Sequence, residues 1–182
     1  MVLFINCCPR SHSRTRYLAG KLLEKFDGYE ELKLYEEKLP ALDNESLQRR
    51  TTLIERKDYS DRMFFYAKQF AKAEAIVIAT PFWDYSFPSV LKTYIENIFV
   101  MGIVSKYGED GTPIGLCNAS KLYYVTTAGG PLDVRFGYEY IKALAQNAFG
   151  IQNVTLIKAE MLDIVGADPE QILEEAAAKI DL

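Results

Sequence analysis

The sequence predicts an α/β fold in which a parallel sheet carries helices on both faces. Three observations predict it. Short, continuous apolar runs of the kind that form fully buried strands recur along the chain. Segments with apolar residues at helical spacing separate these runs, so that strand and helix alternate five times. No repeat, low-complexity tract or linker breaks the alternation, and 182 residues is the length of one domain, so we expect residues 1–182 to form a single domain.

Five segments have the composition of strands. They are residues 2–6, 31–35, 75–79, 121–127 and 154–158. The run 75–79 is the clearest, because it is wholly apolar and Thr80-Pro81 ends it. Residues 31–35 alternate apolar and polar side chains, which is also typical of a strand.

Apolar residues three and four positions apart predict five helices. The predicted helices span residues 13–26, 59–70, 88–98 and 134–149, and a last one begins at Asp168. At the last one Asp168 can cap, Pro169 takes the first helical position, and Gln171 completes a capping-box pattern. Residues 36–50, with Pro40 and weak periodicity, are interpreted as a surface loop. Residues 103–107 and 113–116 flank a Gly-Glu-Asp-Gly turn, which favours a hairpin.

Five alternating units fit the flavodoxin-like winding, a five-stranded parallel sheet with strand order 2-1-3-4-5. In such a sheet the ligand crevice lies at the carboxyl ends of strands 1 and 3, where the winding direction reverses. Functional residues are therefore expected after Asn6, after Ala79 and after Thr127.

Composition excludes several classes of function. The net charge of −4 argues against a nucleic-acid binder. No apolar run is long enough to cross a membrane, and residues 2–6 are too short for a signal-peptide core, so we expect a cytoplasmic protein without membrane insertion. A single histidine, His12, and three cysteines without C-x-x-C spacing predict no metal site. With no G-x-S-x-G elbow either, any difficult chemistry belongs to an organic cofactor.

The first loop, residues 7–15, runs from a strand straight into a helix. Free backbone N–H groups and the helix dipole make such a junction an anion site. Arg10, Ser11, Ser13, Arg14 and Thr15 add hydroxyl and guanidinium groups. Neither G-x-G-x-x-G nor a P-loop is present. The alternative is that Ser13 only caps the helix and the arginines are solvated.

The second and third loops border the same crevice. Residues 80–88 carry four aromatic side chains, which favour either a flat ligand or a cluster that caps the core. In the third loop Gly129 and Gly130 let the backbone approach a ligand closely, although a Gly-Gly pair is also typical of a plain turn. The three loops together predict a ligand site more strongly than any one of them.

The chain resembles the FMN-dependent NAD(P)H-quinone and azo reductases of the flavodoxin-like fold. The second loop, Pro81-Phe82-Trp83-Asp84-Tyr85 followed by Phe87-Pro88-Ser89-Val90-Leu91-Lys92, is similar to that family's P-[MF]-[YW]-N-F…P-x-x-L-K signature. Residues 34–43, the segment 106–111 with Gly115-Leu116, and Ala128-Gly129-Gly130 resemble further segments of the family. The likeness covers essentially the whole chain.

The resemblance implies a site for FMN on the three loops. It assigns the phosphate to the first loop (Ser11, Ser13, Thr15), the isoalloxazine edge to the second (Phe82, Trp83, Asp84, Tyr85) and the pyrimidine side to the third (Thr127, Gly129, Gly130). Arg10 and Pro81 of the same loops are also expected to bind the cofactor. The family commonly has Asn where this chain has Asp84, and an ionised carboxylate cannot donate to a flavin carbonyl.

The function implied is transfer of hydride from NADH or NADPH through FMN to quinones, and to azo or nitro aromatics, by a ping-pong mechanism without a catalytic side chain. Family members are homodimers that borrow aromatic residues from the partner, and Phe99, Met101 and Tyr107 are the candidates here. The alternatives are an NAD(P)H-dependent FMN, chromate or nitro reductase, a flavodoxin-like electron carrier, and a cofactor-free interaction protein.

The sequence leaves the roles of four residues open. Cys7 and Cys8 are either small residues at the end of a buried strand or redox-active thiols beside the flavin. Cys117 is interpreted as structural. His12 is either a solvated loop residue or an aid to phosphate binding.

Overall fold

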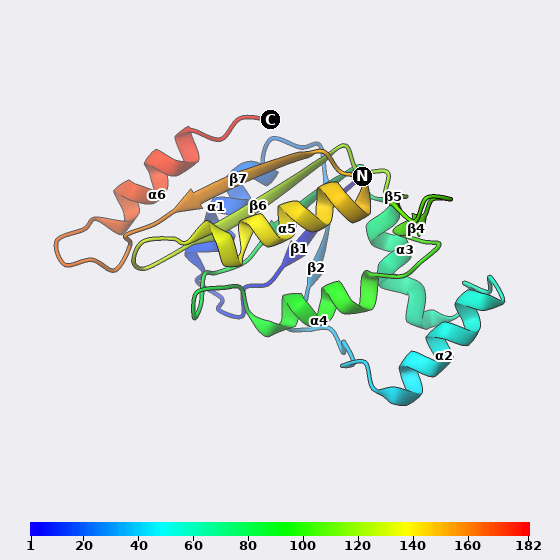
Figure 1. Ribbon diagram of the computed structural model, residues 1–182. Helices are drawn as coiled ribbons and strands as arrows, with labels where there is room; N and C mark the ends of the chain where they lie inside the picture. Colours follow the sequence, from blue (N-terminus) through cyan, green and yellow to red (C-terminus); the bar gives the residue numbers. More distant parts are fainter.

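The computed structural model describes all residues, 1–182, and contains a five-stranded parallel sheet with the order β2-β1-β3-β6-β7 (Figure 1). Counting only the strands of this sheet, the order is the expected 2-1-3-4-5. The strands are β1 (Val2–Asn6), β2 (Tyr29–Lys33), β3 (Ala75–Ala79), β6 (Lys121–Thr127) and β7 (Asn153–Ala159). All four pairings are parallel, so the carboxyl ends of the five strands meet at one edge.

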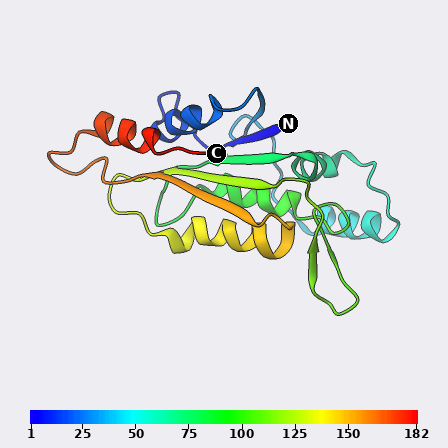
Figure 2. The same ribbon diagram turned by 90° about the horizontal axis from the view of Figure 1, so that it is seen from above.

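Helices cover both faces of the sheet, as expected (Figure 2). One face carries α1 (Arg14–Leu23) and α6 (Pro169–Ala178). The other carries α3 (Phe65–Lys72), α4 (Ser89–Ile98) and α5 (Tyr138–Leu144). The predicted cap of the last helix is confirmed in part, because Asp168 accepts hydrogen bonds from the backbone N–H groups of Glu170 and Gln171, and Pro169 is the first helical residue. The capping box is not completed, because the side chain of Gln171 bonds to Glu175 one turn later instead of to the backbone of Asp168.

The core consists of two clusters of buried side chains, one on each face of the sheet. Successive strand residues point to opposite faces, so Leu122 and Tyr124 of β6 join one cluster while Tyr123 and Val125 join the other. This double burial is the reason that the central strands read as continuous apolar runs rather than alternating ones.

The segment interpreted as a surface loop is partly helical, and that prediction is wrong. Residues Asn44–Glu55 form α2, which begins with a capping box between Asp43 and Ser46. No residue of α2 is buried. Because the helix presents no wide apolar stripe to the core, the periodicity that marks the other helices is weak here.

Other boundaries differ from the expected ones by smaller amounts. Strand β2 lies two residues earlier than expected. The helix predicted to start at residue 59 starts with the short turn Arg62–Phe64. The helix predicted over 134–149 is divided into the turn Val134–Phe136, α5, and the π-helical turn Ala145–Phe149. Gly137, with φ −132° and ψ −80°, separates the first two pieces.

The predicted hairpin is formed by β4 (Ser105–Tyr107) and β5 (Pro113–Gly115), which pair antiparallel. It follows α4, which returns the chain to the amino ends of the strands. The hairpin therefore projects at the end of the molecule opposite the carboxyl edge of the sheet (Figures 1 and 2). No helix of the protein combines the length and the apolar character needed to cross a bilayer.

Candidate functional site

A cavity of about 450 Å³ opens at the carboxyl edge of the sheet. All three loops contribute to it, together with the segment that follows β7. Its lining consists of Pro9, Arg10, His12, Ser13, Arg14, Thr15, Pro81, Phe82, Trp83, Thr127, Ala128, Gly129, Leu162 and Asp163. The position is the crevice expected for this winding, and the volume lies within the range typical of small-molecule sites, about 300–1,000 Å³.

One wall of the cavity is the N-terminus of α1. Ser13 caps this helix, because its hydroxyl accepts from the backbone N–H of Arg16 at 3.2 Å. The backbone N–H groups of Arg14 and Thr15 donate to no atom of the protein. Two unpaired donors at the positive end of a ten-residue helix are the kind of groups that anions bind in proteins.

Thr15 and Thr127 connect the first loop to the third. The two hydroxyl oxygens are 2.6 Å apart, and the side chains belong to the first turn of α1 and the last position of β6. Both residues are buried, with exposed fractions of 1% and 8%. The hydrogen bond therefore fixes the N-terminus of α1 against the carboxyl end of the central strands.

The arginines of this region differ in their partners. Arg14 donates to Asp163 at 2.7 Å, and Arg16 forms an ion pair with Glu31 at 3.4 Å. Arg10 is exposed and has no carboxylate partner. Glu31 in turn accepts from the side-chain amide of buried Asn6, so β1 and β2 together hold Arg16. The site keeps a surplus of positive charge beside the free N–H groups.

The second loop is shaped by a tight turn. Trp83 and Ser86 exchange two backbone hydrogen bonds of 2.8 Å, and the residues between them, Asp84 and Tyr85, both have positive φ, 50° and 65°. Two consecutive left-handed residues make this a type I′ turn, in which Asn, Asp and Gly are favoured at the first position. The presence of Asp84 is explained by this backbone conformation.

The third loop reaches the segment after β7. Asp163, Leu162 and Met161 donate backbone hydrogen bonds to Gly129, Ala128 and Gly130 respectively. A Cβ atom at Gly129 would lie 2.3 Å from a carboxylate oxygen of Asp163, so a larger residue there would displace the Asp163 side chain from its position over this loop. The third loop and Asp163 together close one side of the cavity.

The structure brings most of the expected cofactor-binding residues to one cavity. Eight line it, namely Arg10, Ser13, Thr15, Pro81, Phe82, Trp83, Thr127 and Gly129. Ser11 instead lines the adjoining groove, and Asp84, Tyr85 and Gly130 lie outside the lining. Tyr85 is 70% exposed beside Phe82, with the two ring centroids 6.2 Å apart.

Within one chain the expected acceptor residues lie away from this cavity. Phe99 packs against Phe149 of the core, with ring centroids 5.5 Å apart. The backbone carbonyl of Met101 accepts from the hydroxyl of Tyr59, and Tyr107 stands on the projecting hairpin with 67% of its surface exposed. Since α4 carries all three to the opposite end of the sheet, none of them contributes to the cavity of its own chain.

Sequence reasoning missed the contribution of Leu162 and Asp163. The signal was available, because in this strand order the end of β7 lies beside the end of β6. Residues just after the last strand therefore border the same crevice as the third loop. Arg14, which the sequence analysis named as one of the two arginines of the first loop, also lines the cavity.

The two adjacent thiols are not activated. Burial raises the pKa of the Cys7 thiol well above its usual value, and the neighbouring Cys8 raises it further. Burial also raises the pKa of Cys8. Both therefore remain protonated near neutral pH, which favours the interpretation that they are small residues at the end of a buried strand. Burial likewise raises the pKa of Cys117 to about 12.

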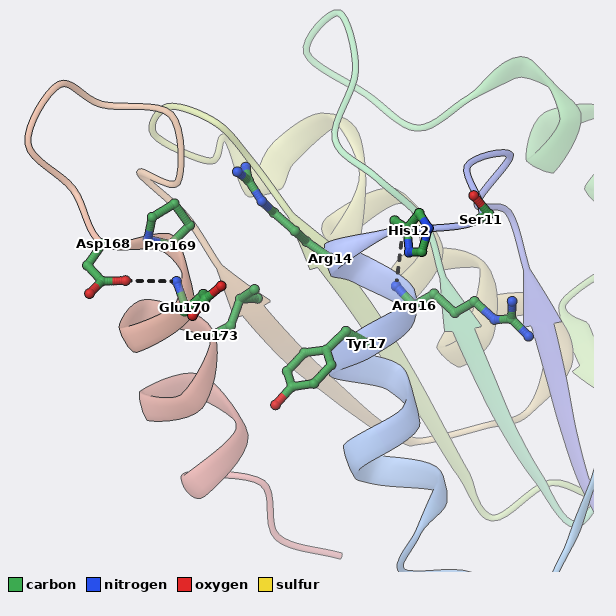
Figure 3. A pocket seen from close by; sticks show the side chains of 10 residues that line it. Ser11, His12, Arg14, Arg16, Tyr17, Asp168, Pro169, Glu170 and Leu173 are labelled. Carbon is green, nitrogen blue, oxygen red and sulfur yellow. Dashed lines mark hydrogen bonds between the residues drawn. The ribbon is translucent and has the colours of Figure 1, made fainter.

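A groove adjoins the cavity, between the N-termini of α1 and α6 (Figure 3). Tyr17 of α1 and Leu173 of α6 lie between the two helices, and the Tyr17 hydroxyl bonds to Glu174. His12, Ser13 and Arg14 border both the groove and the cavity. His12 is exposed and forms no hydrogen bond through its ring.

Comparison with known proteins agrees with this architecture. A family described as having a flavodoxin-like fold matches residues 1–182. The chain is 36% identical to "FMN-dependent NADH:quinone oxidoreductase 2" of Clostridium acetobutylicum, covering 98% of this chain and 94% of that one. It is 33% identical to "FMN-dependent NADH:quinone oxidoreductase" of Clostridium beijerinckii, with the same coverage.

A solved structure, the azoreductase from Bacillus anthracis, superposes with a TM-score of 0.82 at 25% identity, over 97% of this chain and 96% of that one. Fold, cavity and sequence matches over nearly the full length lead to one assignment: the chain belongs to the flavodoxin-like fold family, and within it to the FMN-dependent NADH:quinone oxidoreductases.

Proposed function

We propose that this protein is an FMN-dependent oxidoreductase that transfers hydride from NADH to quinones. The names of the relatives that match over nearly the whole chain support this assignment. Aromatic azo compounds are a second class of acceptor, since a structure that superposes closely is an azoreductase. Both classes are flat conjugated molecules that accept two electrons.

The residues of the cavity fit FMN. Its phosphate requires an anion site, and the unpaired N–H groups of Arg14 and Thr15, the cap residue Ser13 and the guanidinium of Arg10 provide one. Its ring requires a flat apolar neighbour, and Phe82 and Trp83 line the other part of the cavity. Polar and apolar walls are therefore arranged as an amphipathic flavin requires.

FMN, when bound, supplies the redox chemistry, since it accepts a hydride and passes it on. The protein supplies binding and orientation. The second loop is held in one conformation by the Trp83–Ser86 turn, and the Ser86 hydroxyl donates to the backbone carbonyl of Phe136 at 2.7 Å. The backbone N–H of Phe82 donates to the backbone carbonyl of Thr127, and this bond holds the second loop against the third. A rigid cleft of this kind fixes the ring relative to the acceptor.

A homodimer completes the acceptor site in this proposal. The exposed aromatic side chain of Tyr107, on a hairpin that extends from the body of one chain, is suited to reach a neighbouring subunit. Phe99 and Met101 lie at the base of the same hairpin. With the flavin held by the loops of one chain, the partner then contributes only to the binding of the acceptor.

The observation that carries the proposal is the convergence of three loops, each following a different strand, on a cavity with a helix N-terminus at one end and aromatic residues at the other. An electron carrier would use the same cofactor site but would not be reduced rapidly by NADH.

The test is an assay of the purified protein reconstituted with FMN. We expect NADH to be oxidised when a soluble benzoquinone is present, at a rate that depends on added FMN. A Ser13→Ala variant should need a higher FMN concentration to reach half of its maximal rate, because it lacks a hydroxyl of the anion site. Absence of quinone-dependent NADH oxidation in the FMN-saturated protein would refute the proposed activity.

A further inference from the structure

The pair formed by Thr15 and Thr127 has one more proton than it uses. Each threonine hydroxyl carries one proton, and the pair makes a single hydrogen bond, 2.6 Å between the oxygens. A threonine in a helix often donates to the carbonyl four residues earlier, but Thr15 does not. The hydroxyl of Thr127, at the end of a strand, donates to no backbone carbonyl either. One hydroxyl donor of the pair is therefore available to another group.

The cavity offers that donor a place to meet an acceptor. Both residues line it, although their exposed fractions are only 1% and 8%. A nearly buried hydroxyl donor without a partner is costly, so the site favours a ligand that supplies an acceptor oxygen. The unpaired backbone N–H groups of Arg14 and Thr15 lie at the same helix N-terminus.

The direction of the bond decides which part of the ligand is recognised. If Thr127 donates to Thr15, the free proton belongs to Thr15 and is directed to an anion at the start of α1. If Thr15 donates to Thr127, the free proton lies at the end of β6, beside the third loop. A bond to an ionised oxygen is roughly twice as strong as a bond between neutral groups, so a phosphate favours the first direction.

We infer that Thr127 is a positioning residue for the phosphate of the flavin: its hydroxyl donates to Thr15, which in turn donates to a phosphate oxygen. The inference rests on the proposed function, because it requires FMN in this cavity. It changes the role that family resemblance assigns to Thr127, from contact with the pyrimidine side of the ring to support of the phosphate. Hydrogen bonds in such a chain strengthen one another.

The chain offers a matched control in the preceding residue. Thr126 is also buried in β6, with 1% of its surface exposed, but its side chain points to the other face of the sheet and its hydroxyl has no partner. Thr126→Val therefore removes the same atoms from the same strand without touching the cavity.

The experiment compares the dissociation constants of FMN and riboflavin, which differ only in the phosphate, for Thr127→Val, Thr127→Ser, Thr15→Val, the double valine variant and Thr126→Val. We expect Thr127→Val to weaken FMN binding by about fivefold to tenfold and to leave riboflavin binding and the reduction potential of the bound flavin unchanged. Thr127→Ser and Thr126→Val should behave like the wild type. The double variant should bind FMN no more weakly than Thr15→Val, because Thr127 acts only through Thr15.

Equal losses of FMN and riboflavin, or a shifted reduction potential in Thr127→Val, would show that Thr127 contacts the ring and would overturn the inference. Unchanged FMN binding would overturn it as well. Unaltered riboflavin affinity and thermal unfolding midpoints show that the variants are folded. If the wild type itself binds no FMN, it is the proposed function that fails.

Discussion

The guanidinium of Arg14 donates a hydrogen bond of 2.7 Å to the carboxylate of Asp163, a residue 149 positions later in the chain. Both side chains line the cavity, and both are partly exposed. Arg14 stands in the first turn of α1, beside the unpaired N–H groups of the proposed anion site. Asp163 therefore competes with any bound anion for this guanidinium.

Asp163→Asn should strengthen FMN binding. The amide no longer holds Arg14 by charge and no longer repels a phosphate, so we expect the dissociation constant of FMN to fall by up to about fivefold at low ionic strength. The gain should shrink as salt is added. Titration by flavin fluorescence measures it, with riboflavin as the control that should not change. Weaker FMN binding in this variant would mean that Asp163 accepts hydrogen bonds from the flavin instead.

Asp84 should act through its backbone conformation. With φ at 50°, Asp84→Asn should preserve the turn and leave the flavin reduction potential unchanged, because the side chain is exposed outside the cavity. Asp84→Ala should lower the free energy of unfolding by about 1 kcal/mol, since alanine disfavours left-handed conformations. Denaturant titration and flavin potentiometry check the two parts. A potential that rises in Asp84→Asn would show that the carboxylate faces the ring.

The thiols should react slowly with alkylating reagents near neutral pH. Burial raises the pKa values of Cys7 and Cys8, so the reactive thiolate is scarce and labelling should accelerate only as the pH rises above about 9. The same shifts make the free energy of unfolding depend on pH. As the pH rises, the two thiols ionise in the unfolded chain before they ionise in the folded one. Their contribution to stability is therefore intact below the pKa of the unfolded thiols and is lost as the pH rises above it. Mass spectrometry after timed exposure to iodoacetamide measures the labelling, with Cys8, the less buried of the two, modified first. Rapid labelling at pH 7 would indicate redox-active thiols.

Tyr107→Ala should affect the acceptor and not the cofactor. If the hairpin of one subunit completes the acceptor pocket of the other, we expect the KM for quinone to rise severalfold while the flavin content is unchanged. Steady-state kinetics and the flavin-to-protein ratio measure the two quantities. Full activity in a diluted, monomeric sample would exclude a contribution from the partner.

Much of the fold could be predicted, because the central strands are buried on both faces and so appear as unmistakable apolar runs. The order of the strands then placed the three loops at one edge. Helix α2 was missed because none of its residues is buried, and burial is what produces periodicity. Asp163 was missed although the strand order places the end of β7 beside the end of β6, so that residues after β7 border the same crevice. The contact of its side chain with Gly129 joins distant parts of the chain, and spacing along the chain does not encode that contact.

The same distinction applies within the site. The prediction of an anion site at residues 10–15 comes from a strand running into a helix, which is a local pattern. That Thr15 faces Thr127, while Ser13 caps the helix, depends on how α1 is rotated against the sheet. Rotation is set by packing of Leu18 and Leu22 against the core, and only the folded chain reveals it.

Anaerobic reduction of the bound flavin by NADH tests the central assignment most directly. The FMN-loaded protein is mixed with one equivalent of NADH without oxygen, and the flavin absorbance is followed. A quinone is added afterwards in a second mixing step. We expect NADH alone to bleach the flavin within the turnover time of the enzyme, the quinone to restore it at a comparable rate, and steady-state plots to show the parallel lines of a ping-pong mechanism. A flavin that NADH does not bleach, or one that is reduced but not reoxidised by quinone, would contradict the assignment.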